Sequence, residues 1–322
     1  MALREQAGKT VSGAKLASDF GISRVGVWKG IQSLLTAGYF IKANDSGYFL
    51  DPDKNSDFLY PWEFGEKEAM FRFFESTSST MDNARDFASE GRMAGMVAVA
   101  ETQSTGRGRN GRTWASRYGG LYCSFLDRPS VALADYSMPL MLYQIAAAKA
   151  ISAVCGKQAK LRWPNDIYID GLKIAGIITE IKAEGDMISW VVTGIGVNVN
   201  NLSPSAKAVS CSEIVKHAVS RRMLLTAIIK EADQLKKSAG SITAYTQGSR
   251  YLAGEWNSMA DCINAKAAIV DSVNIKRDEK FRMLARGTFA GIDPAGRCII
   301  NSHDKGKAMY FNPGPVSVML LQ

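Results

Sequence analysis

One short stretch of the chain alternates glycine with arginine. Residues 101–114 read ETQSTGRGRNGRTW. Glycines let backbone N–H groups approach a ligand closely, and arginines supply fixed charge with paired donors for phosphate or carboxylate. The stretch therefore indicates a loop that binds an anionic ligand. Its three arginines are Arg107, Arg109 and Arg112.

Apolar runs at residues 96–100 and 121–126 flank this loop, which predicts a strand, a loop and a second strand. The loop glycines also fit the dinucleotide fingerprint. That fingerprint opens a helix, however, and Tyr118-Gly119-Gly120 would break one here. We therefore reject a Rossmann site. A basic surface hairpin remains the alternative interpretation.

Two further motifs follow the loop. Residues 162–176 read RWPNDIYIDGLKIAG, and residues 194–200 read GIGVNVN. Together the three segments resemble the biotin protein ligases, whose hallmarks are a GRGRxGRxW loop, a WPND…GxKxxG segment and a GxGxN segment. The resemblance covers essentially the whole chain. Because the predicted strands lie close together in sequence, we expect a mixed or antiparallel sheet with helices.

The resemblance implies an enzyme that joins biotin and ATP into biotinyl-5′-AMP, with Mg²⁺ accompanying ATP. It would then transfer biotin to a lysine of a biotin carboxyl carrier protein, an acetyl-CoA carboxylase subunit. The acceptor lysine is the nucleophile, so the enzyme needs none. This agrees with the chain, which has two histidines and no evident Cys-His or Ser-His arrangement.

The resemblance also assigns roles to individual residues. The biotin-binding set is Ser79, Thr80, Gln103, Gly106, Arg107, Lys173 and Gly176. The ATP-binding set is Arg109, Arg112, Trp114, Asn165 and Asn198. The catalytic set is Lys173, Arg107 and Arg109, and Asp166 is the candidate for the metal side.

Each assignment has a plainer alternative. Ser79 and its neighbours could cap a helix, Asp166 could close an Asx turn, and Lys173 could be a solvated lysine on a strand edge. The chain also departs from the family at two positions, with Met81 for the usual asparagine and Arg162 for the usual lysine. We expect the glycine-rich loop to become ordered when ligand binds.

The N-terminal residues follow a different pattern. Residues 12–37 predict two helices around the turn Gly21-Ile22-Ser23, with Ser23 capping the second. Leu16, Ala17 and Phe20 are the expected apolar face of the first helix. Residues 39–42 and 47–50 predict a hairpin. The second helix has the expected buried residues Val27, Ile31, Leu34 and Leu35.

A helix-turn-helix followed by a β-wing is typical of winged-helix DNA-binding domains. The segment resembles the N-terminal domain of the ligases that also repress biotin operons, although only residues 1–7 are available for the first helix. The resemblance implies operator DNA as a partner. A domain used only for packing or dimer contact is the alternative. The candidate DNA-binding residues are Arg24, Trp28, Lys29 and Gln32.

We therefore predict an α+β multidomain protein. A winged helix spans residues 1–52 and a polar linker covers 51–57. A class II synthetase-like catalytic core spans 65–266. Short strands broken by turns, including Asp293-Pro294-Ala295-Gly296, predict an SH3-like β-barrel over 267–322. A homodimer is left open.

Composition narrows the class of protein. The 322 residues carry a net charge of +8, which favours an anionic partner. Five scattered cysteines predict reduced core thiols rather than disulfides. No secretory signal is visible, and the apolar helix expected over 140–154 is too short for a bilayer. We expect a cytoplasmic protein that does not bind membranes.

Two other functions stay open. The first is a transcription regulator that binds biotin or its adenylate but ligates poorly; the presence of Arg107, Arg109, Asp166 and Lys173 speaks against it. The second is a lipoate-type ligase on the same fold. The Gly-Arg-Gly-Arg loop and the Trp-Pro-Asn-Asp segment favour biotin.

Overall fold

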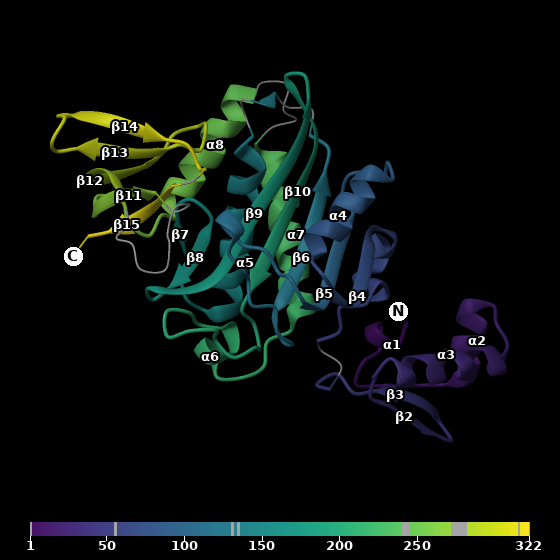
Figure 1. Ribbon diagram of the computed structural model, residues 1–322. Helices are drawn as coiled ribbons and strands as arrows, with labels where there is room; N and C mark the ends of the chain where they lie inside the picture. Colours follow the sequence, from purple (N-terminus) through teal and green to yellow (C-terminus); the bar gives the residue numbers. More distant parts are fainter. Residues whose placement is uncertain are drawn as a thin grey trace. The chain divides into compact units, whose positions relative to one another are not determined.

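The computed structural model describes residues 2–54, 57–129, 132–133, 136–239, 245–271, 282–314 and 316–321. The chain forms two compact units (Figure 1). The first contains Met1–Ala69 with Ser220–Met223, and the second contains Met70–Val219 with Leu224–Gln322. The three-domain boundaries expected from the sequence stay a prediction.

The first unit has the helix-turn-helix and wing that the sequence predicts. Its three strands form an antiparallel sheet in the order β1-β3-β2. The first helix is a single short turn, as the few residues before the second helix required. The elements are α1 (Ala2–Glu5), β1 (Thr10–Val11), α2 (Gly13–Phe20), α3 (Arg24–Thr36), β2 (Ile41–Asn44) and β3 (Gly47–Leu50).

Serine caps begin both main helices of this unit. The Ser23 hydroxyl accepts a hydrogen bond from the Gly26 amide at 3.0 Å, which confirms the predicted cap of α3. The predicted burial of two residues, Phe20 and Leu35, is wrong. Phe20 is 57% exposed because it is the last residue of α2, and Leu35 is 39% exposed. Leu35 lies about 100° around α3 from Leu34, which continues the buried stripe instead.

The segment after the wing packs on this unit. Phe58 stacks on Tyr39 with ring centroids 4.2 Å apart, and Tyr60 stacks on Trp62 at 4.7 Å. The buried Glu63 accepts a hydrogen bond from the Tyr39 hydroxyl at 2.5 Å, and its other oxygen accepts one from Arg4 at 2.9 Å. Residues 58–63 thus belong to the winged-helix core. A 3₁₀ segment, η1 (Pro61–Met70), ends the unit.

The second unit is built on a mixed seven-stranded sheet, in the order β4-β5-β6-β10-β9-β8-β7. The β4–β5 pair is parallel and the other neighbouring pairs are antiparallel, as the short connections predicted. The strands are β4 (Phe71–Thr77), β5 (Val97–Gln103), β6 (Leu121–Asp127), β7 (Lys160–Arg162), β8 (Asp166–Ile169), β9 (Leu172–Glu184) and β10 (Met187–Val197).

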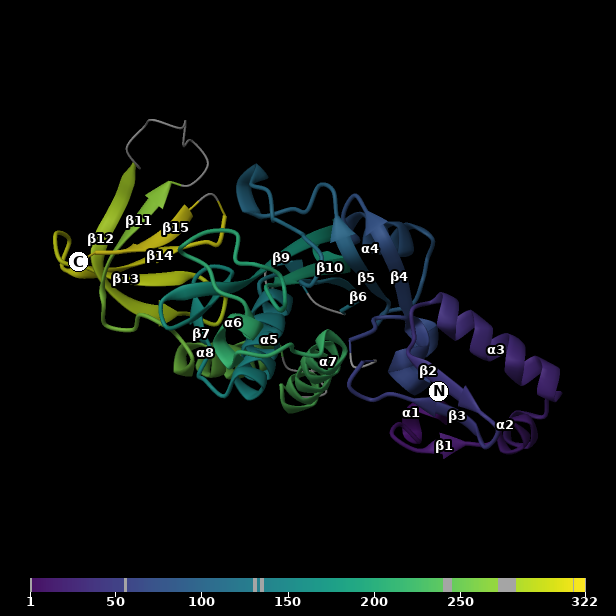
Figure 2. The same cartoon turned by 90° about the horizontal axis from the view of Figure 1, so that it is seen from below.

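Helices cover both faces of this sheet (Figure 2). Helix α4 (Thr80–Ser89) packs with Ala98, Leu126 and Val192 on one face. Helix α5 (Met138–Cys155) packs on the opposite face, where Tyr143 stacks on Phe125 with centroids 4.8 Å apart. Successive strand residues point to opposite faces, so Leu126 of β6 packs with α4 on one face and Phe125 contacts α5 on the other.

Helix α5 is apolar around its whole circumference, and its buried residues accordingly lie on all sides within the second unit. It begins earlier than the sequence predicted and has 18 residues. Within the described residues it is the one helix whose length and composition would allow it to cross a membrane, and 67% of that span is buried inside the protein. Cys155 ends it, and all five cysteines are buried and free, as predicted.

The remaining elements follow the sheet. Three helices are α6 (Cys211–Val215), α7 (Arg221–Ser238) and α8 (Tyr245–Ser258). The C-terminal strands form an antiparallel five-stranded sheet in the order β14-β13-β12-β11-β15. The turn at 293–296 joins two of them, as predicted. These strands are β11 (Lys266–Asp271), β12 (Met283–Ile292), β13 (Cys298–Ser302), β14 (Lys307–Phe311) and β15 (Val316–Leu320).

Ser23→Ala should destabilise α3 by about 1 kcal/mol, because the capped amide loses its partner. Hydrogen exchange of the α3 amides in the full chain should quicken roughly fivefold. Ser33→Ala is the matched control, since the exposed Ser33 hydroxyl only bonds back to the Lys29 carbonyl of the same helix. Equal exchange rates in the two variants would contradict the assigned cap.

Candidate functional site

A large hollow of the second unit lies on the sheet face that α4 covers. It encloses about 530 Å³. Residues from α4, the glycine-rich loop, β8, β9, β10 and the C-terminal sheet line it. Elements far apart in the sequence therefore build one pocket, and most of the residues predicted from the motifs lie on its walls.

One end of the pocket is a recess of hydroxyls and an amide. Gln103 accepts hydrogen bonds from the Thr80 amide at 2.8 Å and the Thr80 hydroxyl at 3.1 Å, and it donates to Ser116 at 2.7 Å. The hydroxyls of Thr80 and Ser124 are 2.8 Å apart. Ser79 caps α4 through a hydrogen bond from the Met81 amide. The capping interpretation of Ser79 is therefore correct, and Ser79 lines the pocket as well.

The glycine-rich loop folds back on itself. Bridges join Gln103 to Ser116 and Arg107 to Thr113, and the Gly108 amide donates to the Arg112 carbonyl at 2.7 Å. Gly106 is buried. A Cβ at this position would lie only 2.5 Å from the Trp114 carbonyl oxygen, so there is no room for a side chain. Gly106 thus shapes the loop without lining the pocket. Ordering of the loop on ligand binding remains a prediction.

Trp114 lies against a floor made of two glycines. Gly176 of β9 and Gly196 of β10 are cross-strand partners. A Cβ at Gly196 would lie 2.5 Å from the Trp114 indole nitrogen, and one at Gly176 would lie 3.0 Å from its ring. Side chains at either position would exclude the ring. The two motifs GLKIAG and GIGVN therefore provide the flat surface for the tryptophan of the loop.

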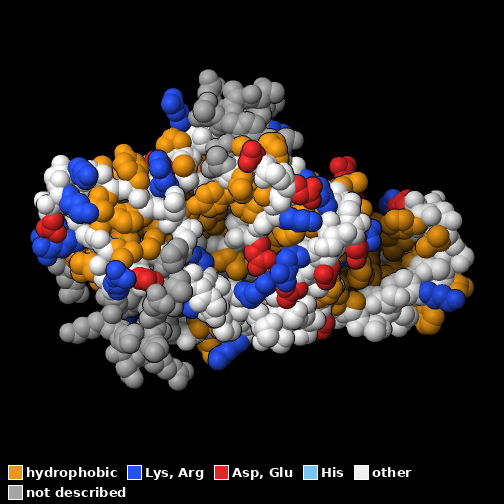
Figure 3. Space-filling view, turned by 45° about the horizontal axis from the view of Figure 1, so that its top comes forward, with side chains coloured by type: hydrophobic (Ala, Val, Ile, Leu, Met, Phe, Trp, Pro, Cys, Tyr) orange, Lys and Arg blue, Asp and Glu red, His pale blue; other side chains and the backbone are white. Residues whose placement is uncertain are grey.

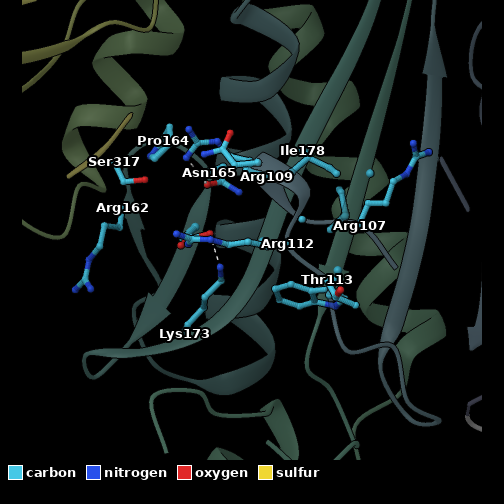
Figure 4. A pocket seen from close by; sticks show the side chains of 18 of the residues that line it. Arg107, Arg109, Arg112, Thr113, Arg162, Pro164, Asn165, Lys173, Ile178 and Ser317 are labelled. Atoms are coloured by element: carbon cyan, nitrogen blue, oxygen red, sulfur yellow. Dashed lines mark hydrogen bonds and ion pairs between the residues drawn. The ribbon is translucent and has the colours of Figure 1, made fainter. Parts of the chain in front are cut away.

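Positive side chains gather at the other end of the pocket. Lys173 and Asp166 form an ion pair of 2.6 Å. The Lys173 ammonium also lies 5.4 Å from the Trp114 ring centroid. Figure 4 shows Arg109, Arg112, Asn165 and Lys173 close together around this pair. Lys173 is therefore not a solvated edge lysine, and Asp166 is its counter-ion as well as the candidate metal residue.

Arg109 joins the loop to the C-terminal sheet. It donates hydrogen bonds to the carbonyls of Gly314 and Val316, the second at 3.0 Å, and to the Asn165 side chain at 3.4 Å. Burial lowers the pKa of Arg109 to about 10, with Asp166 opposing the shift and Arg112 adding to it. The guanidinium stays charged at neutral pH in a half-buried position.

Three residues stand apart from this cluster. In Figure 4 the side chains of Arg107 and Arg162 point away from it. Arg162 instead pairs with Asp261 at 2.9 Å and stacks on Tyr168. Asn198 is buried outside the pocket lining, where its side chain accepts a hydrogen bond from Asn201 at 3.1 Å. The predicted role of Asn198 toward adenine stays a prediction without a contact to support it.

The acidic lining of the pocket could hold a metal ion only together with phosphate oxygens of a ligand. Asp166 is the one acidic residue among those that line the pocket. Across the described part of the chain, no three His, Cys, Asp or Glu side chains group as metal ligands. Mg²⁺ bound with ATP takes one or two carboxylates plus phosphate oxygens, and a single aspartate fits that pattern.

Sequence reasoning missed the contribution of the C-terminus. Val270 and residues 317–320 line the pocket, at least 70 positions beyond the last motif, which ends at Asn200. Tyr168, Ile178 and the backbone of β10 were also missed, although the alternation of β9 could have found Ile178, which follows Gly176 on the same face. No local signal marks the C-terminal residues.

The four candidate DNA-binding residues lie together on the first unit. Arg24, Trp28, Lys29 and Gln32 are all exposed on α3, and Trp28 is 53% exposed. Arg24, Trp28 and Gln32 follow one another at four-residue spacing, so they form one exposed row along α3 beside the row of the buried Val27 and Ile31. The recognition face predicted from the sequence is therefore available for contact.

The comparisons with known proteins agree with these two units. Residues 73–198 match the biotin/lipoate A/B protein ligase family, and residues 1–49 match an HTH domain. Residues 73–198 of the chain thus carry a domain of the biotin/lipoate A/B protein ligase type. It is 38% identical to the bifunctional ligase/repressor BirA of Bacillus subtilis over 62% of this chain and 63% of that protein.

Other relatives extend the likeness. The chain is 38% identical to the bifunctional ligase/repressor BirA of Bacillus spizizenii over 62% of this chain and 64% of that protein, so it matches less than two thirds of these relatives. The fold resembles a biotin protein ligase from Aquifex aeolicus solved with biotin and ATP, with a TM-score of 0.62 and 22% identity. That similarity covers 78% of this chain and 99% of the other.

Gly196→Ala should displace the Trp114 ring, because the new methyl group would overlap the indole. Near-ultraviolet circular dichroism and tryptophan emission should change, and Trp114→Phe identifies the part of each signal that Trp114 contributes. Gly254→Ala is the control, since a Cβ at Gly254 of α8 meets nothing within 4 Å. Unchanged spectra in Gly196→Ala would show that the ring does not rest on Gly196.

Proposed function

We propose that this protein is a biotin protein ligase that also represses transcription through its winged helix. The observation that carries the proposal is the pocket itself, in which a hydroxyl and amide recess faces a cluster of Arg109, Arg112 and Lys173. A ligand with a polar neutral head and an anionic tail fits such a pocket, and biotin has a ureido ring at one end and a carboxylate at the other. The family and its bifunctional relatives support the same activity.

In the proposed complex the ureido ring lies in the recess. Ser79, Thr80 and Gln103 line the recess and offer both donors and acceptors there, while Ser124 is buried behind the Thr80 hydroxyl. Met81 stands where an amide is usual in the family, so the three lining groups would carry the ring recognition. The carboxylate would extend along the face of Gly176 to lie between Arg107 and Lys173, and the adenosine phosphates would lie among Arg109, Arg112 and Asn165.

The first proposed step forms the adenylate. A biotin carboxylate oxygen attacks the α-phosphorus of ATP, the bond to the bridging oxygen of the β-phosphate breaks, and pyrophosphate leaves. Negative charge spreads over the oxygens of the phosphorus in the transition state. Lys173 and Arg109 are positioned to stabilise this charge from fixed places, because backbone bonds to the N–H and the carbonyl of Lys173 and the C-terminal carbonyls around Arg109 hold them.

The second proposed step transfers biotin. The neutral amine of an acceptor lysine attacks the acyl carbon, the bond to the phosphate oxygen breaks and AMP leaves. The acceptor is a biotin carboxyl carrier protein of acetyl-CoA carboxylase. Asp166 would hold Mg²⁺ together with ATP phosphate oxygens, and the metal would supply charge neutralisation there. That role needs the Asp166–Lys173 pair to open or to be shared.

The other parts of the chain take supporting roles in this proposal. The C-terminal sheet is an SH3-like barrel that closes the ATP end of the pocket through Val316 and β15. The winged helix binds operator DNA with Arg24, Trp28, Lys29 and Gln32. We place the protein in the cytoplasm, where ATP and the carrier protein are found. A homodimer on the operator would match two half-sites.

Lys173→Ala should reduce biotin transfer at least a hundredfold, because the developing charge loses its closest fixed cation. The measurement is the mass shift of a purified carrier domain incubated with the protein, biotin and MgATP. Lys182→Ala is the matched control, since Lys182 lies on the same strand, is exposed and has only a 3.7 Å contact with Glu184.

The same assay distinguishes the alternatives. Modification of a lipoyl carrier with lipoate, and none with biotin, would replace the proposed substrate by lipoate. Biotin binding without any transfer by the wild-type protein would leave only a biotin-dependent regulator. Retained transfer in Lys173→Ala would reject the assigned role of Lys173.

Lys29→Ala and Gln32→Ala should affect DNA binding differently. We expect the exposed Lys29 to contact a phosphate, so Lys29→Ala should weaken binding to all DNA sequences. The slope of log K against log salt concentration should become shallower by about one. Gln32 can read a base edge, so Gln32→Ala should mainly relax sequence preference. Binding titrations on selected and random duplexes at several salt concentrations test both variants. If the affinity of Lys29→Ala and the sequence preference of Gln32→Ala both stay unchanged, a packing role for the domain is favoured.

A further inference from the structure

Arg107, alone among the loop arginines, is held by carboxylates. Its guanidinium lies 2.7 Å from Asp82 and 3.1 Å from Glu180. The same two acids also contact Arg85, which pairs with Asp82 and lies 3.6 Å from Glu180. Two arginines and two carboxylates thus alternate in one cluster. By contrast, Arg109 is bound by neutral carbonyl and amide oxygens.

The cluster lies next to the pocket and draws on three elements. Asp82 is in the first turn of α4, directly after the recess residues Ser79 and Thr80. Glu180 follows Gly176 and Ile178 on the same face of β9, and both of these line the pocket. Arg107 comes from the loop and also lines the pocket. The two acids therefore bind an arginine that a ligand in the pocket could reach.

The contacts are strong enough to hold Arg107 and weak enough to be exchanged. The side chains of Arg107, Asp82 and Glu180 are each about one third exposed, at 31%, 32% and 33%. Figure 3 shows basic and acidic side chains next to one another on part of one face of the molecule. Ion pairs that water reaches contribute little and rearrange readily. A carboxylate of a ligand would meet Arg107 only by displacing one of the two acids.

We propose that Asp82 and Glu180 set the affinity of the pocket for a ligand carboxylate by competing with it for Arg107. This inference rests on the proposed function, because it takes biotin as the ligand. The two acids act through Arg107 and are specificity-determining residues, which do not touch the reacting atoms. Their competition acts on the carboxylate alone, so a ligand without that charge should not sense them.

The test compares biotin with biotinol, its alcohol analogue, by calorimetric titration of the full chain. Glu180→Gln should tighten biotin binding roughly three- to tenfold, because Arg107 loses one competing carboxylate. Biotinol binding should stay unchanged. Glu184→Gln is the matched control, since Glu184 lies on the same strand, is exposed and has a loose 3.7 Å contact with Lys182.

Two further variants separate competition from a general effect on folding. Asp82→Asn removes the second acid and should act in the same direction as Glu180→Gln. In an Arg107→Gln background, Glu180→Gln should leave biotin affinity unchanged, because no arginine remains to be released. Thermal unfolding of each variant shows whether it is folded.

The outcomes distinguish this inference from the function on which it rests. Binding of neither ligand by the wild-type protein would overturn the proposed function and this inference with it. Biotin binding that Glu180→Gln and Asp82→Asn leave unchanged or weaken would overturn the inference alone. Equal tightening of biotin and biotinol, or tightening that persists in the Arg107→Gln background, would also overturn it.

Discussion

The structure depends on keeping several positive charges together in one pocket. Arg109, Arg112 and Lys173 gather where a single carboxylate, Asp166, lines the wall. Like charges at this distance repel one another, and the lowered pKa of Arg109 reflects its burial together with the neighbouring Arg112. The protein offsets the repulsion with dipoles, since carbonyls from the C-terminal segment and the Asn165 amide oxygen bind Arg109. Those groups keep the cluster in place while leaving its charge available to an anion.

Strand pairing fixes the positions of these charges. The Lys173 amide donates to the Lys207 carbonyl, and the Val209 amide donates to the Lys173 carbonyl, each at 3.0 Å. The segment 207–209 therefore holds both the N–H and the carbonyl of Lys173. The register of β9 and β10 places Gly176 opposite Gly196. A shift of one residue would put side chains where Trp114 now rests, so the charge cluster and the tryptophan depend on the same register.

Local features of the fold could be predicted from the sequence. The Asp170-Gly171 turn has φ angles of 50° and 76°, which Asp-Gly pairs favour, and it delivers Lys173 onto β9 as expected. The Ser23 cap and the strands around the glycine-rich loop are equally local. The contacts of Arg109 with Gly314 and Val316 could not be predicted, because they join residues 205 and 207 positions apart without any pattern in between. Phe20 and Leu35 failed for a related reason, since helical periodicity gives a face but not what covers it.

The arginines of one loop thus have different partners. Arg109 is bound by dipoles, which orient the guanidinium without cancelling its charge. Arg107 is bound by two carboxylates, which do cancel it. An incoming anion gains the full attraction of the first arginine, whereas at the second it must replace an existing ion pair of similar strength. A sequence motif of alternating glycine and arginine does not distinguish these cases, because the difference comes from residues on α4, β9 and the C-terminal strand. The motif determines how many charges enter the pocket, and the surrounding elements determine how much of each charge a ligand can use.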